Sequence, residues 1–318
     1  MPPARIFLHM AAPMFFGTET PRPFWGLLRS GLQAEGICVE HALLDRATFL
    51  SDIEGDGDFH IVNHGNFRHP RVLNAALAYV APYWYLDPQG IRAGSSIGGL
   101  AFDADGIGSA QAADFHRRLA RRQIAARTSR YPQPVELADI PDRCIAVFLQ
   151  SEDHRAVEET CHLDRAAMLE ALLARADPAP IVVKAHPRDG SAATRKWLAD
   201  LSRRDSRVMI ADANIHDILS RAAVTVTINS AVGIEGLIHR VPLVLCGRTD
   251  FHHIAETVTT PGGMDEAIRR ALGRPRPYAE YLWWFFRRNC IASGSPTLAQ
   301  DALARIAAQG FHTETLRR

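Results

Sequence analysis

The sequence has no surplus of charge of either sign. Its 318 residues include 36 Lys and Arg against 35 Asp and Glu, so the formal net charge is +1. A protein that binds nucleic acid usually carries a pronounced basic surplus, because its contacts with phosphate require cations. We therefore expect no nucleic-acid partner, and any basic surface has to be local.

Cysteine is scarce and unpatterned. The five cysteines are Cys38, Cys144, Cys161, Cys246 and Cys290. Their number is odd, their spacing is wide and no C-x-x-C pair occurs, which argues against a disulfide framework and against a zinc site. The histidines lack an H-E-x-x-H or comparable spacing, so we expect no metal. This usage is typical of a reducing cytoplasm.

Long apolar runs are also missing. The longest, Val72 to Leu86, is interrupted by Asn74 and Pro82 and is too short to cross a bilayer. The first ten residues lack the apolar region of a signal peptide and are predicted to form a buried strand. These features predict a cytoplasmic protein without a membrane span.

Strand and helix patterns alternate through the chain. Before a proline-rich stretch at 131–141, we expect strands at 5–10, 37–43, 59–63 and 83–86, and helices at 24–34, 73–79 and 109–128. After it, we expect strands at 144–149, 181–185, 207–211, 224–228 and 242–246, and helices at 165–175, 192–202, 215–221 and 233–239. Alternation of this kind predicts two doubly wound α/β domains. We place them at 1–138 and 139–274, followed by a helical segment at 275–318 that packs back on the first domain.

The strand predicted at 181–185 ends in a group of polar residues. The carboxyl ends of strands in a doubly wound sheet are where anionic ligands usually bind. Lys184 and His186 can neutralise the phosphate of a nucleotide leaving group, while Pro187 ends the strand and presets the turn. The alternative is a histidine packed in an ordinary turn.

A second junction follows the strand predicted at 224–228. Asn229 and Ser230 precede a helix that starts near Gly233, and the N–H groups of a helix start favour phosphate or carboxylate. Glu235, one turn into this helix, can bind ribose hydroxyls. For Ser230 an ordinary helix cap is the alternative. The two junctions together predict a nucleotide-phosphate site at one edge of a sheet.

Two carboxylates also follow predicted strands. Asp153 can attack an anomeric carbon or stabilise an oxocarbenium-like centre, and a surface position in a charged run is its alternative. Asp87 can exchange a proton with an acceptor hydroxyl, and a plain Asp-Pro turn is its alternative. The loop that carries His64, Asn66 and Arg68 suits either contact with an acceptor sugar or an ordinary loop.

Several motifs follow one another in order. They are Phe148-Leu-Gln150-Ser-Glu152-Asp153, Lys184-Ala-His186-Pro187-Arg188-Asp189, Thr227-Ile-Asn229-Ser230-Ala-Val-Gly233-Ile-Glu235-Gly236-Leu237 and Pro242-Leu-Val-Leu-Cys-Gly247. This series, mainly within residues 143–250, resembles the bacterial capsule polysaccharide biosynthesis family. Upstream, Leu86-Asp87-Pro-Gln-Gly90-Ile-Arg92-Ala-Gly94-Ser95 looks like a divergent form of the family's acidic-Gly-x-x-Arg-Ser segment.

The resemblance implies a GT-B-like fold, with two doubly wound domains facing a cleft and C-terminal helices crossing back. The same architecture also occurs in some epimerases and two-domain binding proteins. The resemblance implies Asp153 as nucleophile, ahead of Glu152, with Asp87 as acid/base and His186 as a further catalytic residue. It places Gln150, Lys184, Pro187, Asn229, Ser230, Gly233 and Glu235 at the donor, and we assign Arg92, with His64, Asn66 and Arg68 of the loop described above, to the acceptor.

We therefore expect a metal-independent glycosyltransferase. It would move Kdo or a related 2-keto acid sugar, with retention, from a CMP-sugar to a surface glycan or a lipid-linked glycan. The CMP-sugar is a co-substrate, and no cofactor is expected. The first domain would bind the acceptor and the second the nucleotide sugar.

Two alternative functions and one structural question stay open. The chain could be a transferase or epimerase that uses a UDP- or GDP-sugar, with Arg188 and Arg248 as additional cations. It could also be a non-catalytic scaffold of a polysaccharide assembly complex. The aromatic and basic segment 278–288 is either a buried brace or a peripheral contact with the inner membrane.

Overall fold

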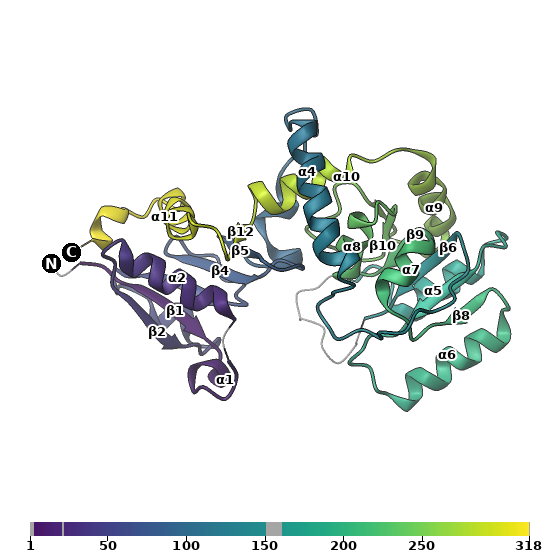
Figure 1. Cartoon of the computed structure of the whole chain (residues 1–318). Helices are drawn as coiled ribbons and strands as arrows, with labels where there is room; N and C mark the ends of the chain where they lie inside the picture. Colours follow the sequence, from purple (N-terminus) through teal and green to yellow (C-terminus); the bar gives the residue numbers. More distant parts are fainter. Residues whose placement is uncertain (1–2, 21, 151–160, 318) are drawn as a thin grey trace. The chain divides into compact units, whose positions relative to one another are not determined.

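The computed structural model describes residues 3–20, 22–150 and 161–317. Its contacts divide the chain into two compact units. One unit comprises residues 1–100 and 285–318, and the other comprises residues 101–284. Each unit contains one six-stranded sheet (Figure 1).

The first sheet has the strand order β12-β5-β4-β3-β1-β2. Its strands are β1 (Ile6–Met10), β2 (Val39–Leu43), β3 (Phe59–Asn63), β4 (Val72–Leu77), β5 (Tyr83–Asp87) and β12 (Ile291–Ala292). The first four are parallel, whereas β5 pairs antiparallel with β4 and β12. The helices α2 (Pro23–Ala34) and α11 (Leu298–Ala308) bury their apolar faces against one side of this sheet. The short helices α1 (Ala12–Phe15) and α3 (Phe49–Asp52) complete the unit, and Phe49 of α3 packs on the other side.

The helix predicted at 73–79 is wrong, because the structure has β4 at Val72–Leu77. Its two faces belong to different cores, since Leu73 and Ala75 pack in one and Val72 in the other, so Val72 to Ala76 are all buried. A strand covered on both faces is a continuous apolar run without alternation, which periodicity cannot distinguish from a buried helix.

The second sheet is entirely parallel, with the order β11-β10-β9-β6-β7-β8. Its strands are β6 (Cys144–Phe148), β7 (Ile181–Lys184), β8 (Val208–Ile210), β9 (Ala222–Thr227), β10 (Leu243–Leu245) and β11 (Glu256–Thr257). In chain order within the unit this is 3-2-1-4-5-6, the Rossmann arrangement, and the direction of winding reverses between β6 and β9. The five strands predicted from the sequence are all present, and β11 adds a sixth.

Helices cover both faces of the second sheet. They are α5 (Arg165–Leu173), α6 (Ala192–Arg204), α7 (Ile215–Arg221), α8 (Val232–Ile238) and α9 (Met264–Gly273), while α4 (Ser109–Ala120) and α10 (Tyr278–Trp283) pack against α8. The apolar residues of α5, α6 and α9 form one core with the sheet, and those of α7 form the core on the opposite face. α4 continues as a π-helix at Arg121–Ala125 and packs against α8 and α10.

Residues 101–138 belong by contact to the second unit, whereas the sequence-based boundary lay after residue 138. The reason is the packing of α4, where His116 Nε2 donates to the carbonyl oxygen of Ile238 at 2.9 Å. The tail returns to the first unit only from residue 285 on, where β12 extends its sheet and α11 packs against α2, whereas residues 275–284 of the predicted segment belong to the second unit. The two-residue strand β12 was not predicted.

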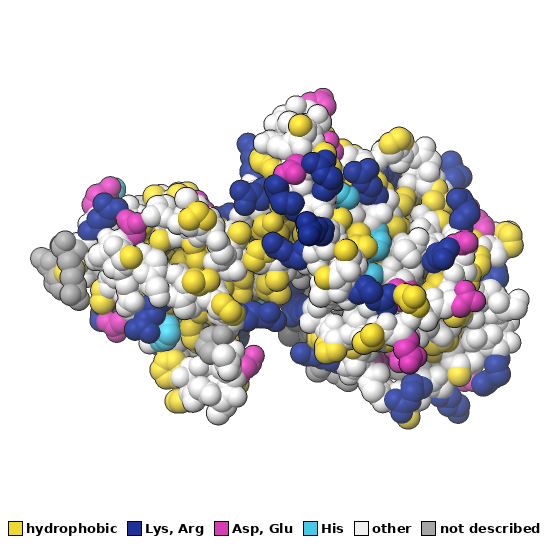
Figure 2. Space-filling view, viewed as in Figure 1, with side chains coloured by type: hydrophobic (Ala, Val, Ile, Leu, Met, Phe, Trp, Pro, Cys, Tyr) yellow, Lys and Arg dark blue, Asp and Glu magenta, His cyan; other side chains and the backbone are white. Residues whose placement is uncertain are grey.

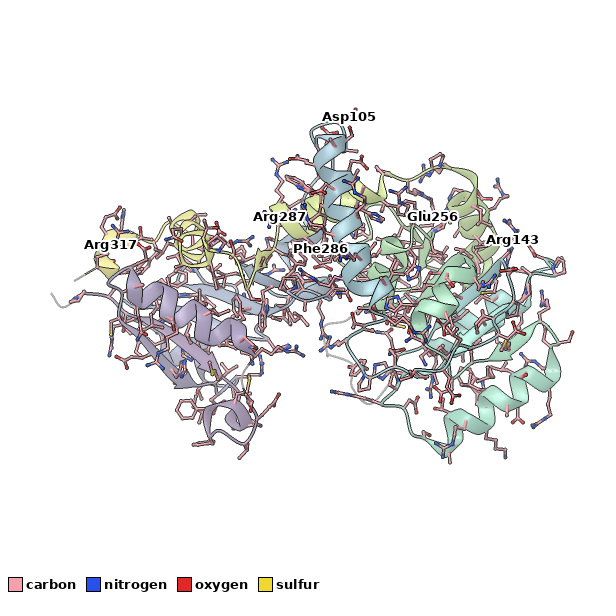
Figure 3. All side chains as sticks on the ribbon, viewed as in Figure 1. Asp105, Arg143, Glu256, Phe286, Arg287 and Arg317 are labelled. Atoms are coloured by element: carbon pink, nitrogen blue, oxygen red, sulfur yellow. The ribbon has the colours of Figure 1, made fainter. Side chains whose placement is uncertain are left out.

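The aromatic side chains of the segment 278–288 are mostly buried. Tyr281 packs edge-on against Phe102 in the second unit, with ring centroids 5.1 Å apart, and Phe286 contacts Tyr83 in the first unit at 4.8 Å. Phe286 and the exposed Arg287 are labelled in Figure 3. None of the helices among the described residues combines the length and apolar character that crossing a bilayer requires.

Basic side chains gather locally over α4 (Figure 2). Arg117 and Arg118 are exposed there, and both pair with Asp114 one helical turn away. Exposed pairs of this kind contribute little to stability, so their effect is mainly on the local surface potential.

Candidate functional site

The winding reversal of the second sheet brings together two residues predicted at the donor. Gln150 follows β6 and Asn229 follows β9. The backbone N–H of Asn229 donates to Gln150 Oε1 at 3.3 Å, and Gln150 Nε2 donates to Asn229 Oδ1. Loops diverge at such a reversal and leave room for a ligand beyond the strand ends. This amide pair therefore marks the centre of the candidate site.

The helix start beside this pair is shaped by packing. Ser230 Oγ accepts a hydrogen bond from the N–H of Val232 at 3.3 Å, but the N-cap of α8 is Ala231, so Ser230 stabilises the turn that leads into the helix. Gly233 is buried, and a Cβ atom there would lie 2.9 Å from the ring of Phe251. Glycine at this position lets α8 approach Phe251, so its contribution to a site is the placement of the helix.

Lys184 and His186 lie at the carboxyl end of β7, next to β6. Lys184 is 6% exposed, and its Nζ lies 3.5 Å from Oδ1 of Asp212, whose side chain is almost fully exposed. A nearly buried ammonium beside one solvated carboxylate keeps much of its capacity to attract an anion. His186 begins a turn in which Pro187 follows and the N–H of Asp189 donates to the His186 carbonyl at 2.9 Å.

The side chain of Asp189 anchors this turn. Its Oδ2 accepts from Arg165 Nη1 at 2.9 Å and from Thr194 Oγ1 at 3.1 Å, and its Oδ1 accepts from the N–H of Ser191 at 3.2 Å. These bonds connect the turn to α5 and α6. The position of His186 is therefore fixed by a framework that lies outside the site itself.

Glu235 lies on α8 and is only 3% exposed. Burial raises the pKa of its carboxyl to about 7, and a hydrogen bond with Ser129 acts in the opposite direction. Its Oε1 has no hydrogen-bond partner among the described residues. An unpaired buried oxygen is costly, so Glu235 destabilises the fold unless a further group donates a hydrogen bond to it.

The sequence analysis missed two residues that reach this site. Ser129 contacts Glu235, and the ring of Tyr131 packs edge-on against His186 with centroids 5.2 Å apart. Both precede or begin the proline-rich stretch, which has no periodic pattern to reveal a buried face. An aromatic residue beside Arg130 is the only local signal of a binding segment, and it is weak.

Asp87 ends β5 in the first unit and is 2% exposed. Its Oδ1 accepts from the N–H groups of Gln89 at 2.8 Å, Gly90 at 3.1 Å and Ser96 at 3.0 Å. Its Oδ2 accepts from the Ser96 hydroxyl at 2.6 Å. These contacts are those of a turn anchor, the alternative that the sequence left open, and the acid/base role of Asp87 stays a prediction.

The residues predicted at the acceptor gather around this turn only in part. Asn66 Oδ1 accepts from the N–H of Ile91 at 3.0 Å, which places Asn66 beside Arg92. His64 Nδ1 lies 2.8 Å from Asn63 Oδ1, and Arg68 is exposed. His64 and Arg92 both adopt positive φ, 52° in each case, an uncommon conformation for residues with side chains.

The predicted nucleophile Asp153 and its neighbour Glu152 lie outside the described residues, so their roles stay predictions. Within the described ranges, no three His, Cys, Asp or Glu side chains come together as ligands for a metal ion.

Similar structures define the class of fold. The chain is similar to a β-Kdo 2,7 transferase, KpsC of Thermosulfurimonas dismutans, with a TM-score of 0.53 and 13% identity over 96% of this chain and 99% of that one. It is also similar to a β-Kdo 2,4 transferase, KpsC of the same organism, with a TM-score of 0.51 and 16% identity over 86% and 88%. At these identities the likeness concerns the fold, and the GT-B-like class expected from the sequence is confirmed.

The chain belongs to the capsule polysaccharide biosynthesis protein family, whose sequence profile matches residues 108–271, more than half of its length. The match includes the segment 143–250 on which the resemblance was based. No curated protein matches the chain.

Proposed function

We propose that the protein is a glycosyltransferase that moves Kdo or a related 2-keto acid sugar from a CMP donor to a surface-glycan acceptor. Family membership and the similarity in fold to two Kdo transferases support this proposal. The observation that carries it is the arrangement at the winding reversal of the second sheet. The amide pair lies there between β7, whose end carries the positive charge of Lys184 and the imidazole of His186, and α8, where Glu235 Oε1 has no hydrogen-bond partner among the described residues.

Each part of this arrangement has a task in the proposed reaction. Lys184 and His186 stabilise the phosphate charge that develops as CMP leaves, while Glu235 accepts hydrogen bonds from the ribose. Both sets of side chains are held in position before the reaction begins. The turn at His186 is anchored by Asp189, and Glu235 is buried in α8.

Retention is proposed to occur in two steps. A carboxylate oxygen of Asp153 bonds to the anomeric carbon while the bond to phosphate breaks and CMP leaves with the electron pair. The acceptor hydroxyl then attacks the same carbon, Asp153 leaves with its electron pair, and a base takes the hydroxyl proton. Intact-protein mass spectrometry after incubation with CMP-Kdo should show a sugar-sized adduct at Asp153. An adduct at Glu152, or a product of inverted configuration, would contradict this assignment.

The central test combines binding and transfer. CMP, UMP and GDP are titrated into the protein by calorimetry, and CMP release from CMP-Kdo is followed in the presence of acceptor. We expect CMP to bind most tightly. His186→Ala should reduce transfer by on the order of 2 to 4 kcal/mol of transition-state stabilisation, with an unchanged melting temperature.

The matched control is His312→Ala, because His312 is an exposed histidine in the first unit. It should transfer like the wild type. Tighter binding of UMP or GDP than of CMP would favour a different nucleotide donor, and binding of none of the three would favour a scaffold.

A further inference from the structure

One segment of the second unit, residues 127–134, lies against the candidate site and is here called the rim segment. Both of its ends are tied to α7. At its start, Arg127 Nη2 donates to Asp217 Oδ2 at 3.1 Å. At its end, Asn214 Nδ2 donates to the carbonyl oxygen of Pro134 at 3.2 Å. A segment held at both ends has little freedom to move away from the residues it covers.

A chain of two histidines holds the rim segment between these ends. His216 Nε2 lies 2.8 Å from the carbonyl oxygen of Thr128, and His216 Nδ1 lies 2.9 Å from His239 Nε2. Because a carbonyl oxygen only accepts, His216 donates through Nε2 and accepts from His239 through Nδ1. Burial lowers the pKa of both rings, that of His239 to about 4, so both are neutral near pH 7 and this pattern is maintained.

Tyr131 of the rim segment lies between two residues of the turn after β7. Its ring meets the ring of His186 at an interplanar angle of 79°, and the Arg188 guanidinium lies 5.1 Å from its centroid. An edge-to-face contact and a cation–π contact each favour one orientation of the groups involved. The same two neighbours of Tyr131 are also linked to each other.

A hydrogen bond between Arg188 and His186 sets the tautomer of the imidazole. The backbone N–H of Arg188 donates to His186 Nδ1 at 3.1 Å, so in the neutral ring the proton resides on Nε2. The ring of Tyr131 then limits rotation of the imidazole about its side-chain bonds. Together the two contacts fix which nitrogen carries the proton and in which direction it points.

We propose that Tyr131 is a positioning residue that holds the His186 imidazole in the orientation that donates to the phosphate of the nucleotide. This inference rests on the proposed function, because it assumes that His186 meets that phosphate. It assigns the aromatic ring, and not the phenolic hydroxyl, as the part of Tyr131 that acts. Misorientation of a charge-stabilising group by a fraction of an ångström weakens its effect strongly.

The test measures CMP affinity by calorimetry in three variants. Tyr131→Leu should weaken CMP binding about ten-fold, because the imidazole loses its lateral support. Tyr131→Phe, which keeps the ring, should bind within about two-fold of the wild type. Val135→Ser is the matched control from the adjoining residue, whose side chain is 90% exposed, and it should bind like the wild type. Melting temperatures should stay close to one another.

A double-mutant cycle separates positioning from general disruption of the site. In a His186→Ala background, Tyr131→Leu should have no further effect on CMP affinity, because its target is gone. Additive losses, or a loss in Tyr131→Phe as large as in Tyr131→Leu, would overturn the proposal. If Tyr131→Leu binds CMP as tightly as the wild type does, the positioning role is overturned too. In each of these cases the wild type still binds CMP, so the proposed function is not affected. If the wild type binds none of CMP, UMP and GDP, the proposed function itself falls and this inference with it.

Discussion

Asp87 and Glu235 are both buried carboxylates, one in each unit, and they differ in how their oxygens are satisfied. Asp87 receives hydrogen bonds on both oxygens, from three backbone N–H groups and the hydroxyl of Ser96. Glu235 has one oxygen without a partner among the described residues, and burial raises its pKa to about 7. A carboxylate whose acceptor capacity is filled stabilises the fold, whereas one with an unfilled oxygen is suited to receive a ligand.

The largest expected difference is in stability. Asp87→Ala should lower the free energy of unfolding by about 3 kcal/mol, because the N–H groups of Gln89, Gly90 and Ser96 lose their acceptor. Asp87→Asn keeps one carbonyl oxygen and should lose about 1 kcal/mol. Urea unfolding measures both values. If Asp87→Asn unfolds like the wild type but has lost transfer, Asp87 is an acid/base and the comparison with Glu235 fails.

A second difference concerns pH. Because the pKa of Glu235 is raised on folding, the folded state binds a proton more tightly than the unfolded state between pH 4.5 and about 7. The contribution of Glu235 to the free energy of unfolding is therefore fully present below its pKa in the unfolded state. It is lost as the pH rises through its pKa in the folded state. Glu235→Gln should be more stable than the wild type at pH 8, on the order of 3 kcal/mol, and nearly equal at pH 4. A difference that does not change with pH would show that folding does not raise the pKa of Glu235.

A third prediction addresses the ligand of Glu235. Glu235→Met has similar length and no oxygen, so it should weaken CMP binding about ten-fold through loss of the bond to a ribose hydroxyl. Binding of the 2′,3′-dideoxy analogue of CMP, which lacks both hydroxyls, should be the same in the variant and the wild type. Calorimetry with both nucleotides checks this, and an equal loss for both would remove the ribose from the assignment.

The smallest expected effect is at the partner of Asp87. Ser96→Ala removes the hydrogen bond from the Ser96 hydroxyl to Asp87 Oδ2, at 2.6 Å, and leaves the one from the Ser96 backbone N–H in place. The free energy of unfolding should fall by about 1 kcal/mol, without a change in CMP affinity. Reduced CMP affinity in this variant would connect the Asp87 turn to the nucleotide and weaken the distinction between the two carboxylates.

The sequence predicted the elements whose signals are local. The five strands of the second sheet that the sequence predicted are all present, because each apolar run ends in turn residues. β4 was mistaken for a helix, because burial on both faces removes the alternation that identifies a strand. The contact of Tyr131 with His186 joins residues 55 positions apart in the numbering, and no local pattern encodes it. The contacts of Asp87 with its turn likewise depend on tertiary geometry.

The discontinuity of the first unit has a consequence for synthesis. Residues 101–284 form a continuous unit, whereas the unit built on the first hundred residues also requires residues 285–318. Until α11 emerges from the ribosome, the apolar surface of α2 and its sheet lacks Leu298, Ala302 and Ile306, all of which are buried there in the folded chain. The first half to be translated is therefore the last to complete its core, and it must stay free of aggregation while the second unit folds.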